Sequence, residues 1–277
     1  MIQKILLTGA GGKLGRRLRQ PLARLCDALV STDLVALSPV AGNETVVSAD
    51  LADASAVERL VAGAHAIVHF AGYPREADWA SLIPANIVAT THLWEAALAH
   101  GVRRIVYAST NHVVGFHPVG RHIGVNDEIK CDSRYGVSKA FAETLARFYY
   151  EKYGIESLGL RIGRCEEAPT DERMLSTWLH PDDLVQLVGL GLHHPVRADI
   201  AYGISDNARA WCSNPPAEEL PYRPAHRADS YPLPASQPAA PSRWLFQGGP
   251  FAQADYRGET TRAADFYRNT SCGPSKP

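Results

Sequence analysis

The sequence predicts an α/β fold in which a doubly wound parallel sheet is followed by a small C-terminal portion. Over the first 165 residues, short β-branched runs alternate with longer amphipathic stretches, as is typical of parallel strands joined by crossover helices. A glycine-rich turn at residues 9–15 directly follows the first of these runs. Beyond residue 165 the alternation stops, and nine of the 19 prolines fall between residues 215 and 250.

Six strands are expected, because six short aliphatic or β-branched runs are bounded by Gly, Asp or Ser. They lie at residues 5–8, 28–33, 45–47, 66–70, 104–108 and 157–162. Helical patterns lie at residues 14–25, 55–61, 82–100, 138–153 and 181–192. The last pattern starts with Pro181, followed by Asp182 and Asp183, and a helix favours these residue types in its first turn.

Two regions are expected, a core over residues 1–165 and a smaller region over residues 166–277, which together form one integrated unit. The proline-rich stretch in the second region cannot hold long regular elements. It is either a disordered linker or an ordered wrap. Trp244, Phe246 and Phe251 favour docking of its end on the body of the protein.

Composition excludes several classes of protein. With 28 Lys and Arg against 29 Asp and Glu, the net charge is −1, which gives no basic field for a nucleic-acid partner. No apolar run approaches the roughly 20 residues of a membrane span, so no membrane association is expected. The five cysteines are scattered and form no CxxC pair, so we expect no disulfide framework, no metal site and a cytoplasmic location.

A Rossmann-type, dinucleotide-binding core is indicated by Gly9, Gly12 and Gly15, which stand between the first strand and the first helix. Glycines let the backbone turn tightly and approach a pyrophosphate at the helix N-terminus. Lys13 and Leu14 are expected beside the same group. Asp33 ends the second strand, where a carboxylate accepts hydrogen bonds from the ribose hydroxyls and repels a 2′-phosphate. The expected cofactor is therefore NAD rather than NADP.

Two further segments fit the same cleft. Asp50 and Leu51 follow the third strand and are placed to border the adenine, although Asp50 could instead be the N-cap of the next helix. Ala71 and Gly72 follow the fourth strand, and their small size lets the backbone pass close to a cofactor.

A catalytic group is indicated by Tyr135 and Lys139, a YxxxK motif near the start of a helix. Residues four apart share one helix face, so the ammonium can lie near the phenol oxygen. A nearby cation favours phenolate and lowers the phenol pKa, which makes the phenol a base near neutrality. Thr110 offers a hydroxyl at the end of a strand, at the same edge of the sheet.

In this order and spacing, these motifs resemble the extended short-chain dehydrogenase/reductase family over roughly residues 1–210. The resemblance implies that Tyr135 is the catalytic base. It also implies that Lys139 holds the nicotinamide ribose and lowers the pKa of Tyr135, and that Thr110 orients the substrate oxygen.

A narrower resemblance, to the bacterial uronate dehydrogenases, extends over nearly the whole chain. It rests on STNHVVGF, YGVSK, RIG, RMLSTWL and FQGG, at residues 109–116, 135–139, 161–163, 173–179 and 246–249. The resemblance implies NAD-dependent oxidation of D-galacturonate or D-glucuronate at C1 to the aldarolactone. It also implies a homo-oligomer that forms through the helices at 82–100 and 138–153.

A uronate requires a cation for its C6 carboxylate, and Arg173 can bind such a group bidentately. Alternatively, Arg173 pairs with the neighbouring Asp171 or Glu172. Asn111 and His112 follow Thr110 and are expected to contact sugar hydroxyls, although His112 could be purely structural.

Two residues depart from the pattern of these enzymes. Arg164 stands where a small residue such as Ser is expected, and Pro74 stands where a small hydroxyl residue would help to hold the sugar. Both departures concern the preferred sugar, and they make Arg164 a rival to Arg173 for the carboxylate.

Two other functions stay open. The chain could be a nucleotide-sugar epimerase or dehydratase, although such an enzyme needs a larger C-terminal region and clustered basic residues for a second pyrophosphate. It could also be a non-catalytic dinucleotide-sensing protein, which has no need for Thr110, Tyr135 and Lys139 together.

Overall fold

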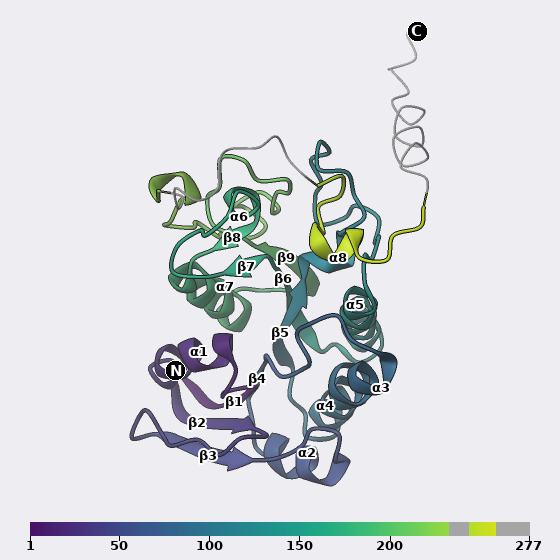
Figure 1. Cartoon of the computed structure of the whole chain (residues 1–277). Coiled ribbons are helices and arrows are strands. Elements are labelled where there is room, and N and C mark those ends of the chain that lie inside the picture. Colours follow the sequence, from purple (N-terminus) through teal and green to yellow (C-terminus); the bar gives the residue numbers. More distant parts are fainter. Residues whose placement is uncertain (233–243, 259–277) are drawn as a thin grey trace, which may run out of the picture.

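The computed structural model describes residues 1–232 and 244–258, and it is built around a seven-stranded parallel sheet (Figure 1). The strand order is β3-β2-β1-β4-β5-β6-β9, which is the doubly wound arrangement predicted from the sequence. The strands are β1 (Ile2–Thr8), β2 (Cys26–Asp33), β3 (Glu44–Ser48), β4 (Ala66–His69), β5 (Arg104–Thr110), β6 (Glu156–Ile162) and β9 (Ala198–Gly203). A separate small sheet pairs β7 (Arg164–Cys165) with β8 (Trp178–Leu179).

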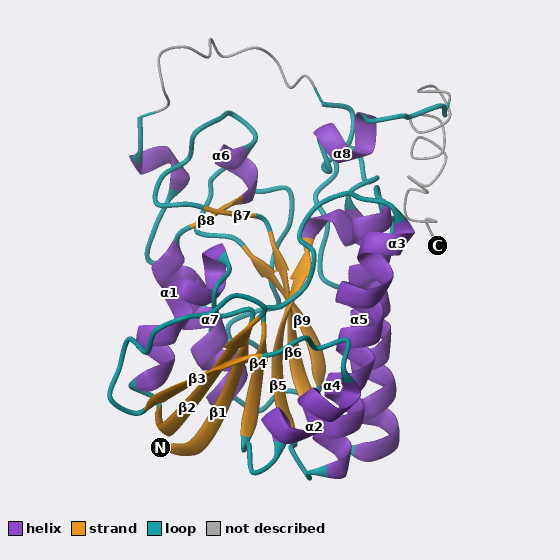
Figure 2. Cartoon of the chain, turned by 60° about the horizontal axis from the view of Figure 1, so that its bottom comes forward, coloured by secondary structure: helices purple, strands orange, loops and turns teal. Residues whose placement is uncertain are grey.

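Helices cover both faces of the large sheet (Figure 2). One face carries α1 (Lys13–Ala23) and α7 (Pro181–His193), and their leucines share a buried cluster with Ile5 and Leu158. The other face carries α2 (Ala54–Val61), α4 (Ala89–Ala99) and α5 (Arg134–Tyr153). The short helices are α3 (Trp79–Leu82), α6 (Met174–Thr177) and α8 (Pro250–Gln253), with a π-helical turn at Ile83–Val88 and 3-10 turns at Asn111–Val114 and Ala228–Ser230.

All six predicted strands and all five predicted helices are present, with shifted ends. The helix predicted at 82–100 is in fact α3, the π-helical turn and α4 in succession. α5 starts four residues earlier than predicted, because the Ser133 hydroxyl caps it by accepting the Gly136 N–H at 3.0 Å. The seventh strand, β9, was not predicted, because its sequence ADIAYG lacks a β-branched run. It pairs with β6 and extends the sheet beyond residue 165.

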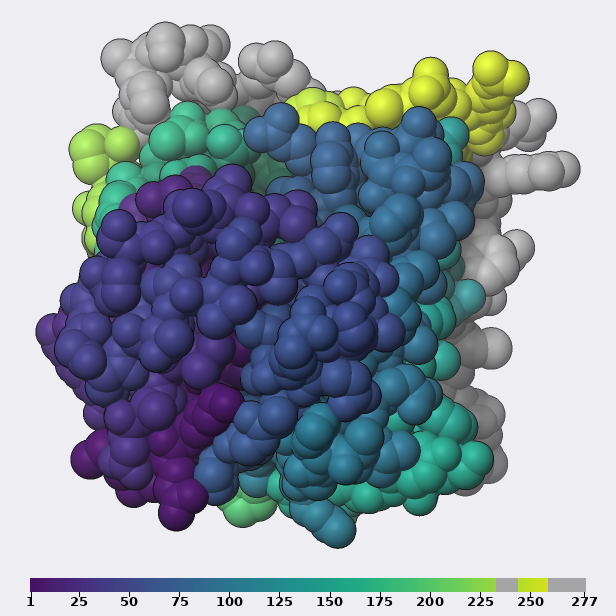
Figure 3. All heavy atoms as spheres, turned by 90° about the horizontal axis from the view of Figure 1, so that it is seen from below, coloured from purple at the N-terminus to yellow at the C-terminus, as the bar shows by residue number. Residues whose placement is uncertain are grey.

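The described part of the proline-rich stretch is an ordered wrap. Leu220 is buried, and the Tyr222 hydroxyl donates to the Ile204 carbonyl at 2.8 Å. Residues 233–243 lie outside the described residues. The segment that follows docks as predicted, since Phe246 is buried and its ring packs edge-on against Phe116. In the space-filling view, residues 244–258 (yellow) lie along one edge of the visible face (Figure 3).

Within residues 1–232 and 244–258, no helix combines the length and the apolar character that crossing a membrane requires.

Candidate active site

The glycine-rich turn lies between β1 and α1, and its backbone is packed too closely for larger residues. Gly9 has φ +72°, and a Cβ there would meet the Phe70 and Ala71 backbone at 2.5 Å. A Cβ on Gly15 would lie 2.0 Å from the Gly9 carbonyl oxygen. Gly12 is the N-cap of α1 and supplies no side-chain acceptor, so the first N–H groups of the helix are left for an anion. The turn therefore fits a pyrophosphate.

Asp33 and the glycine turn are joined directly. The Asp33 Oδ2 atom accepts the Gly11 N–H at 2.8 Å, and Oδ1 accepts the Val35 N–H at 3.3 Å. The carboxylate thus stands at the end of β2, beside the turn, where a ribose is expected. Lys13 is half-exposed and forms an ion pair with Glu166, while Leu14 packs against the core.

The structure shows which aspartate after β3 is the N-cap of α2. Asp53, and not Asp50, caps α2, because its Oδ1 accepts the Ser55 and Ala56 N–H groups. Asp50 instead closes a short turn by accepting the Ala52 N–H at 2.9 Å. The Leu51 side chain is buried in the hydrophobic core.

Gly72 brings the backbone after β4 close to α5. It has φ +140°, and a Cβ there would lie 2.8 Å from Asn86 Oδ1 and 3.4 Å from Lys139 Nζ. Asn86 sits in the π-helical turn and is buried, and its Nδ2 donates to the Ser138 hydroxyl at 2.9 Å. π-Helical turns are frequent at functional sites. Asn86 was missed by the sequence analysis, because nothing in its local pattern marks it.

Thr110 and Tyr135 meet at the carboxyl edge of β5, and Lys139 lies one turn further along α5. Thr110 hydrogen-bonds with the Tyr135 phenol, and both side chains are buried. The neighbouring Ser109 is turned away, because its hydroxyl donates to Glu143 at 2.6 Å beneath the site. Lys139 is also buried, and this burial lowers its pKa to about 8.

The pKa of Tyr135 differs from the expectation. Burial raises the pKa of its phenol to about 12, and the hydrogen bond with Thr110 opposes this only in part. The expected lowering by Lys139 is not seen in the chain by itself, where burial of the phenol sets the direction of the shift.

His112 is held by a carboxylate that the sequence analysis missed. Its Nδ1 lies 2.8 Å from Asp132 Oδ2, and the Ser133 hydroxyl donates to the other oxygen at 2.7 Å. The Asp132 side chain is completely buried. A Cβ on Gly115 or on Gly248 would come within 1.8 Å and 1.7 Å of its Oδ2. Both glycines are therefore required to seat this carboxylate.

The imidazole of His112 stands between two aromatic rings. It stacks on Phe251 of α8, with ring centroids 4.1 Å apart, and meets Tyr135 edge-on at 6.1 Å. The C-terminal segment thus reaches Tyr135 through His112.

Arg173 does not form the surface pair considered as an alternative. Its Nη2 and Nε donate to the Gln247 carbonyl at 2.7 and 3.2 Å. In the amide orientation that satisfies both neighbours, Asn111 Oδ1 accepts a second bond from Nη2 at 2.8 Å. Among the described residues, no carboxylate lies within ion-pair distance of this guanidinium, and Asp171 instead accepts the Met174 N–H. Arg173 is thus a cation held by neutral acceptors.

The two departures from the family pattern lie on the exposed side of the site. The Arg164 side chain is 56% exposed, and its Nε stands 3.6 Å from Glu166. Its positive charge contributes to lowering the pKa of Arg173, after burial. Pro74 is exposed in the loop after Gly72.

Comparison with known proteins gives consistent matches. Residues 5–180 match the NAD dependent epimerase/dehydratase family. The chain is 41% identical to the uronate dehydrogenase of Pseudomonas putida, covering 91% of this chain and 96% of that protein. It is 35% identical to the NAD-dependent glucose-6-phosphate dehydrogenase of Haloferax volcanii, covering 77% and 89%. A crystal structure of a mutant uronate dehydrogenase from Agrobacterium tumefaciens complexed with NAD matches with a TM-score of 0.84 and 37% identity, covering 91% and 97%.

Proposed function

The chain belongs to the NAD-dependent epimerase/dehydratase family and, within it, to the uronate dehydrogenases, and on this premise we propose that it oxidises a hexuronate at C1 with NAD. The substrate is D-galacturonate or D-glucuronate in its ring form, and the product is the aldarolactone. Residues 1–165 hold the dinucleotide, and the smaller C-terminal region contributes Arg173 to the sugar-binding side.

The cofactor fits the chain at the glycine turn, at Asp33 and at the backbone of Ala71 and Gly72. Bound NAD⁺ supplies the acceptor for the hydride that leaves C1. Asp33 binds the ribose hydroxyls, and Lys139, beside Gly72, holds the second ribose. Asp50 and Leu51 border the adenine.

Tyr135 takes the proton. As the C1–H electron pair departs, the C1 hydroxyl gives its proton to the Tyr135 oxygen, and the C1–O bond becomes the carbonyl of the lactone. Thr110 holds that hydroxyl in place. Because burial, opposed in part by the Thr110 hydrogen bond, raises the phenol pKa to about 12, Tyr135 needs positive charge to act near neutrality. Lys139, with a pKa of about 8, is still mostly charged there and provides it.

The observation that carries the proposal is the state of Arg173. This guanidinium is held in place by the Gln247 carbonyl and by Asn111, yet its charge is not neutralised by a carboxylate at ion-pair distance among the described residues. A C6 carboxylate would supply that missing charge. Asn111 and His112, which connect Thr110 to Arg173, are placed for the sugar hydroxyls between C1 and C6.

A substrate panel tests the proposal directly. The purified protein is incubated with NAD and with galacturonate, glucuronate, galactose or glucose, while the absorbance of reduced nicotinamide is followed. We expect turnover of the two uronates and little turnover of the neutral hexoses. Turnover of nucleotide sugars alone would instead favour an epimerase or dehydratase. Binding of NAD without turnover of any sugar would favour a non-catalytic sensor.

One observation favours a second candidate substrate, a sugar 6-phosphate. The Arg164 charge contributes to lowering the Arg173 pKa, although the Asp171 and Asp132 carboxylates act in the opposite direction, so Arg164 is a second cation near Arg173. A dianionic phosphate suits two arginines better than a carboxylate does. Glucose 6-phosphate should therefore be added to the substrate panel. Faster turnover of glucose 6-phosphate than of glucuronate would support a sugar 6-phosphate as the substrate.

We also propose a homo-oligomer in the cytoplasm. On α5, Val137, Phe148 and Tyr153 are exposed, and Ile83 is exposed just before α4. These apolar side chains support an interface through the two helices. The four described cysteines are free, in keeping with a reducing compartment. Light scattering during size-exclusion chromatography measures the oligomeric state.

A further inference from the structure

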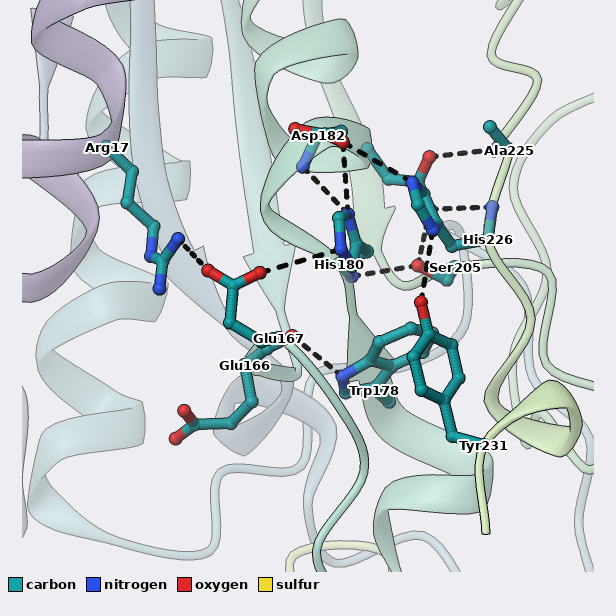
Figure 4. A network of polar contacts seen from close by, with 11 residues as sticks. Arg17, Glu166, Glu167, Trp178, His180, Asp182, Ser205, Ala225, His226 and Tyr231 are labelled. Carbon is teal, nitrogen blue, oxygen red and sulfur yellow. Dashed lines mark hydrogen bonds and ion pairs between the residues drawn. The ribbon is translucent and has the colours of Figure 1, made fainter.

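Two histidines and an aspartate meet where α7 begins, in a cluster that the proposed oxidation does not use (Figure 4). His180 precedes the helix, Asp182 lies in its first turn, and His226 comes from the ordered wrap. Asp182 Oδ2 lies 3.6 Å from His180 Nδ1 and 3.5 Å from His226 Nε2. One carboxylate oxygen therefore faces a nitrogen of each imidazole.

The wrap is fixed at this point by the helix. The Asp183 carboxylate accepts the Ala225 N–H at 2.8 Å and the His226 N–H at 3.3 Å. The two imidazoles are stacked, with ring centroids 3.5 Å apart and planes at 17°. Their nitrogens thus lie at one edge of the stack, the edge that Asp182 closes.

We propose that His180, Asp182 and His226 form a binding site for a divalent transition-metal ion of the zinc class. Such ions bind imidazole nitrogen and carboxylate oxygen at about 2.0–2.2 Å, and tetrahedral geometry then separates two ligand atoms by roughly 3.4 Å. The two separations of 3.5 and 3.6 Å match this value. Because the two ring planes are 17° apart, their lone pairs run nearly parallel, and metal binding requires the exposed edge of the stack to open by rotation of at least one ring.

The surroundings of the cluster are those of a metal site. A histidine that binds a metal commonly has its second nitrogen near a carboxylate or another polar group, which fixes the ring. His180 Nε2 lies 3.7 Å from Glu167 Oε2, and His226 Nδ1 lies 3.4 Å from the Tyr231 hydroxyl. Asp182 is 77% exposed, which leaves an entry path and room for a water as the fourth ligand.

His180 already has a structural role, and the experiment must separate the two. Its Nδ1 accepts the Asp182 N–H at 3.1 Å and so caps α7, a bond that the ion would replace. His180→Ser removes the ligand but keeps a good N-cap, because serine is among the preferred residues at that position. The spacing of the cysteines predicted no metal site. That prediction did not consider His180 and His226, which lie far apart in the sequence and form no metal-binding motif.

The test uses the full chain without a histidine tag. Co²⁺ is titrated while the visible absorption is recorded, and Zn²⁺ is then added in competition. We expect one Co²⁺ per chain with the intense absorption of tetrahedral cobalt, displaced by Zn²⁺, and a higher unfolding temperature with Zn²⁺. His180→Ser and His226→Gln should each weaken binding at least tenfold, and Asp182→Asn should weaken it several-fold.

The matched control is His100→Gln, because His100 pairs with Glu58 at 2.7 Å but belongs to no three-ligand cluster among the described residues. It should bind Co²⁺ like the unmodified chain. The proposal fails if the unmodified chain shows no saturable binding, or if binding survives unchanged in both His180→Ser and Asp182→Asn. If His226→Gln does not fold, these two variants decide the matter. None of these measurements depends on dehydrogenase activity.

Discussion

The cofactor side and the substrate side of the site are built in different ways. On the cofactor side, the contacts are mostly made by backbone at the ends of neighbouring strands, since Gly9 follows β1, Asp33 ends β2, and Gly15 packs on Gly9 from the first turn of α1. On the substrate side, Arg173 reaches Gln247, 74 residues away, and His112 stacks on Phe251. The first side needs only the sheet, whereas the second also needs the C-terminal segment to dock.

Because of this difference, substitutions on the two sides should affect different ligands. A change at the glycine turn or at Asp33 should affect the dinucleotide and leave the sugar alone. A change at Arg173, Asp132 or the C-terminal segment should affect the sugar and leave NAD affinity alone. Tyr135 lies where the two sides meet, so its loss should stop turnover without weakening either ligand much.

The largest effect is expected at that meeting point. Tyr135→Phe removes the ionisable oxygen with little change of shape, so kcat should fall by about two to four orders of magnitude. Steady-state rates measure the fall, and calorimetry should show NAD binding close to that of the unmodified chain. Near-normal turnover would move the base elsewhere, with His112 as the next candidate.

The pH dependence of kcat/KM shows how that base is tuned. Because the active form of Tyr135 is deprotonated and burial raises its pKa, oxidation should rise as the pH increases through neutrality. Lys139→Met removes the cation that favours phenolate, so the phenol pKa should increase and the rising limb should move to higher pH by about 1–3 units. An unmoved limb would show that Lys139 does not tune Tyr135.

On the substrate side, Arg173 should have the strongest effect. A charge-assisted bidentate contact contributes roughly 2–3 kcal/mol, so Arg173→Ala should lower kcat/KM for a uronate by about 100-fold. Arg173→Lys should recover only part of this, since an ammonium cannot reproduce the planar fork.

Arg164→Ala is the matched comparison for Arg173. Its side chain is more than half exposed and faces Glu166, so we expect a much smaller loss with uronates. The reverse ranking of the two arginines would mean that Arg164 binds the carboxylate. In each variant, the dissociation constant for NAD should be unchanged.

Asp132 tests whether the substrate side is held together by its buried carboxylate. Asp132→Asn keeps the size but loses the charge that holds His112 Nδ1, so kcat/KM for a uronate should fall about tenfold, mainly through KM. Asp127→Asn serves as control, as Asp127 pairs with Arg121 away from His112. Equal losses in both variants would indicate a general structural effect.

The smallest effect is expected on the cofactor side, at Asp33. Asp33→Ala removes the carboxylate proposed to bind the ribose, and also the acceptor of the Gly11 N–H. A loss of roughly 1 kcal/mol raises the KM for NAD about fivefold and narrows the preference over NADP. Initial rates with both cofactors measure this ratio. Wild-type selectivity in the mutant would exclude Asp33 as the ribose ligand.

Much of the cofactor side could be predicted because its signals are local. Strand periodicity, glycine spacing and an acidic strand end all fall within the first 33 residues, and each can be recognised from the sequence around it. The same holds for Tyr135 and Lys139, which share a helix face by periodicity alone. Thr110 followed from its place at a strand end, and the structure puts it beside Tyr135.

What the tertiary structure decided is where distant side chains meet. β9 escaped prediction because its pairing with β6, and not its composition, makes it a strand. Asp132 and Asn86 carry no motif, and only packing brings them to His112 and Ser138. The pKa shifts were also beyond the sequence. Burial raises the pKa of Tyr135 and lowers that of Arg173, and burial is a property of the folded chain. Local structural preferences can be recognised in a sequence, whereas desolvation and long-range contacts exist only in the folded chain.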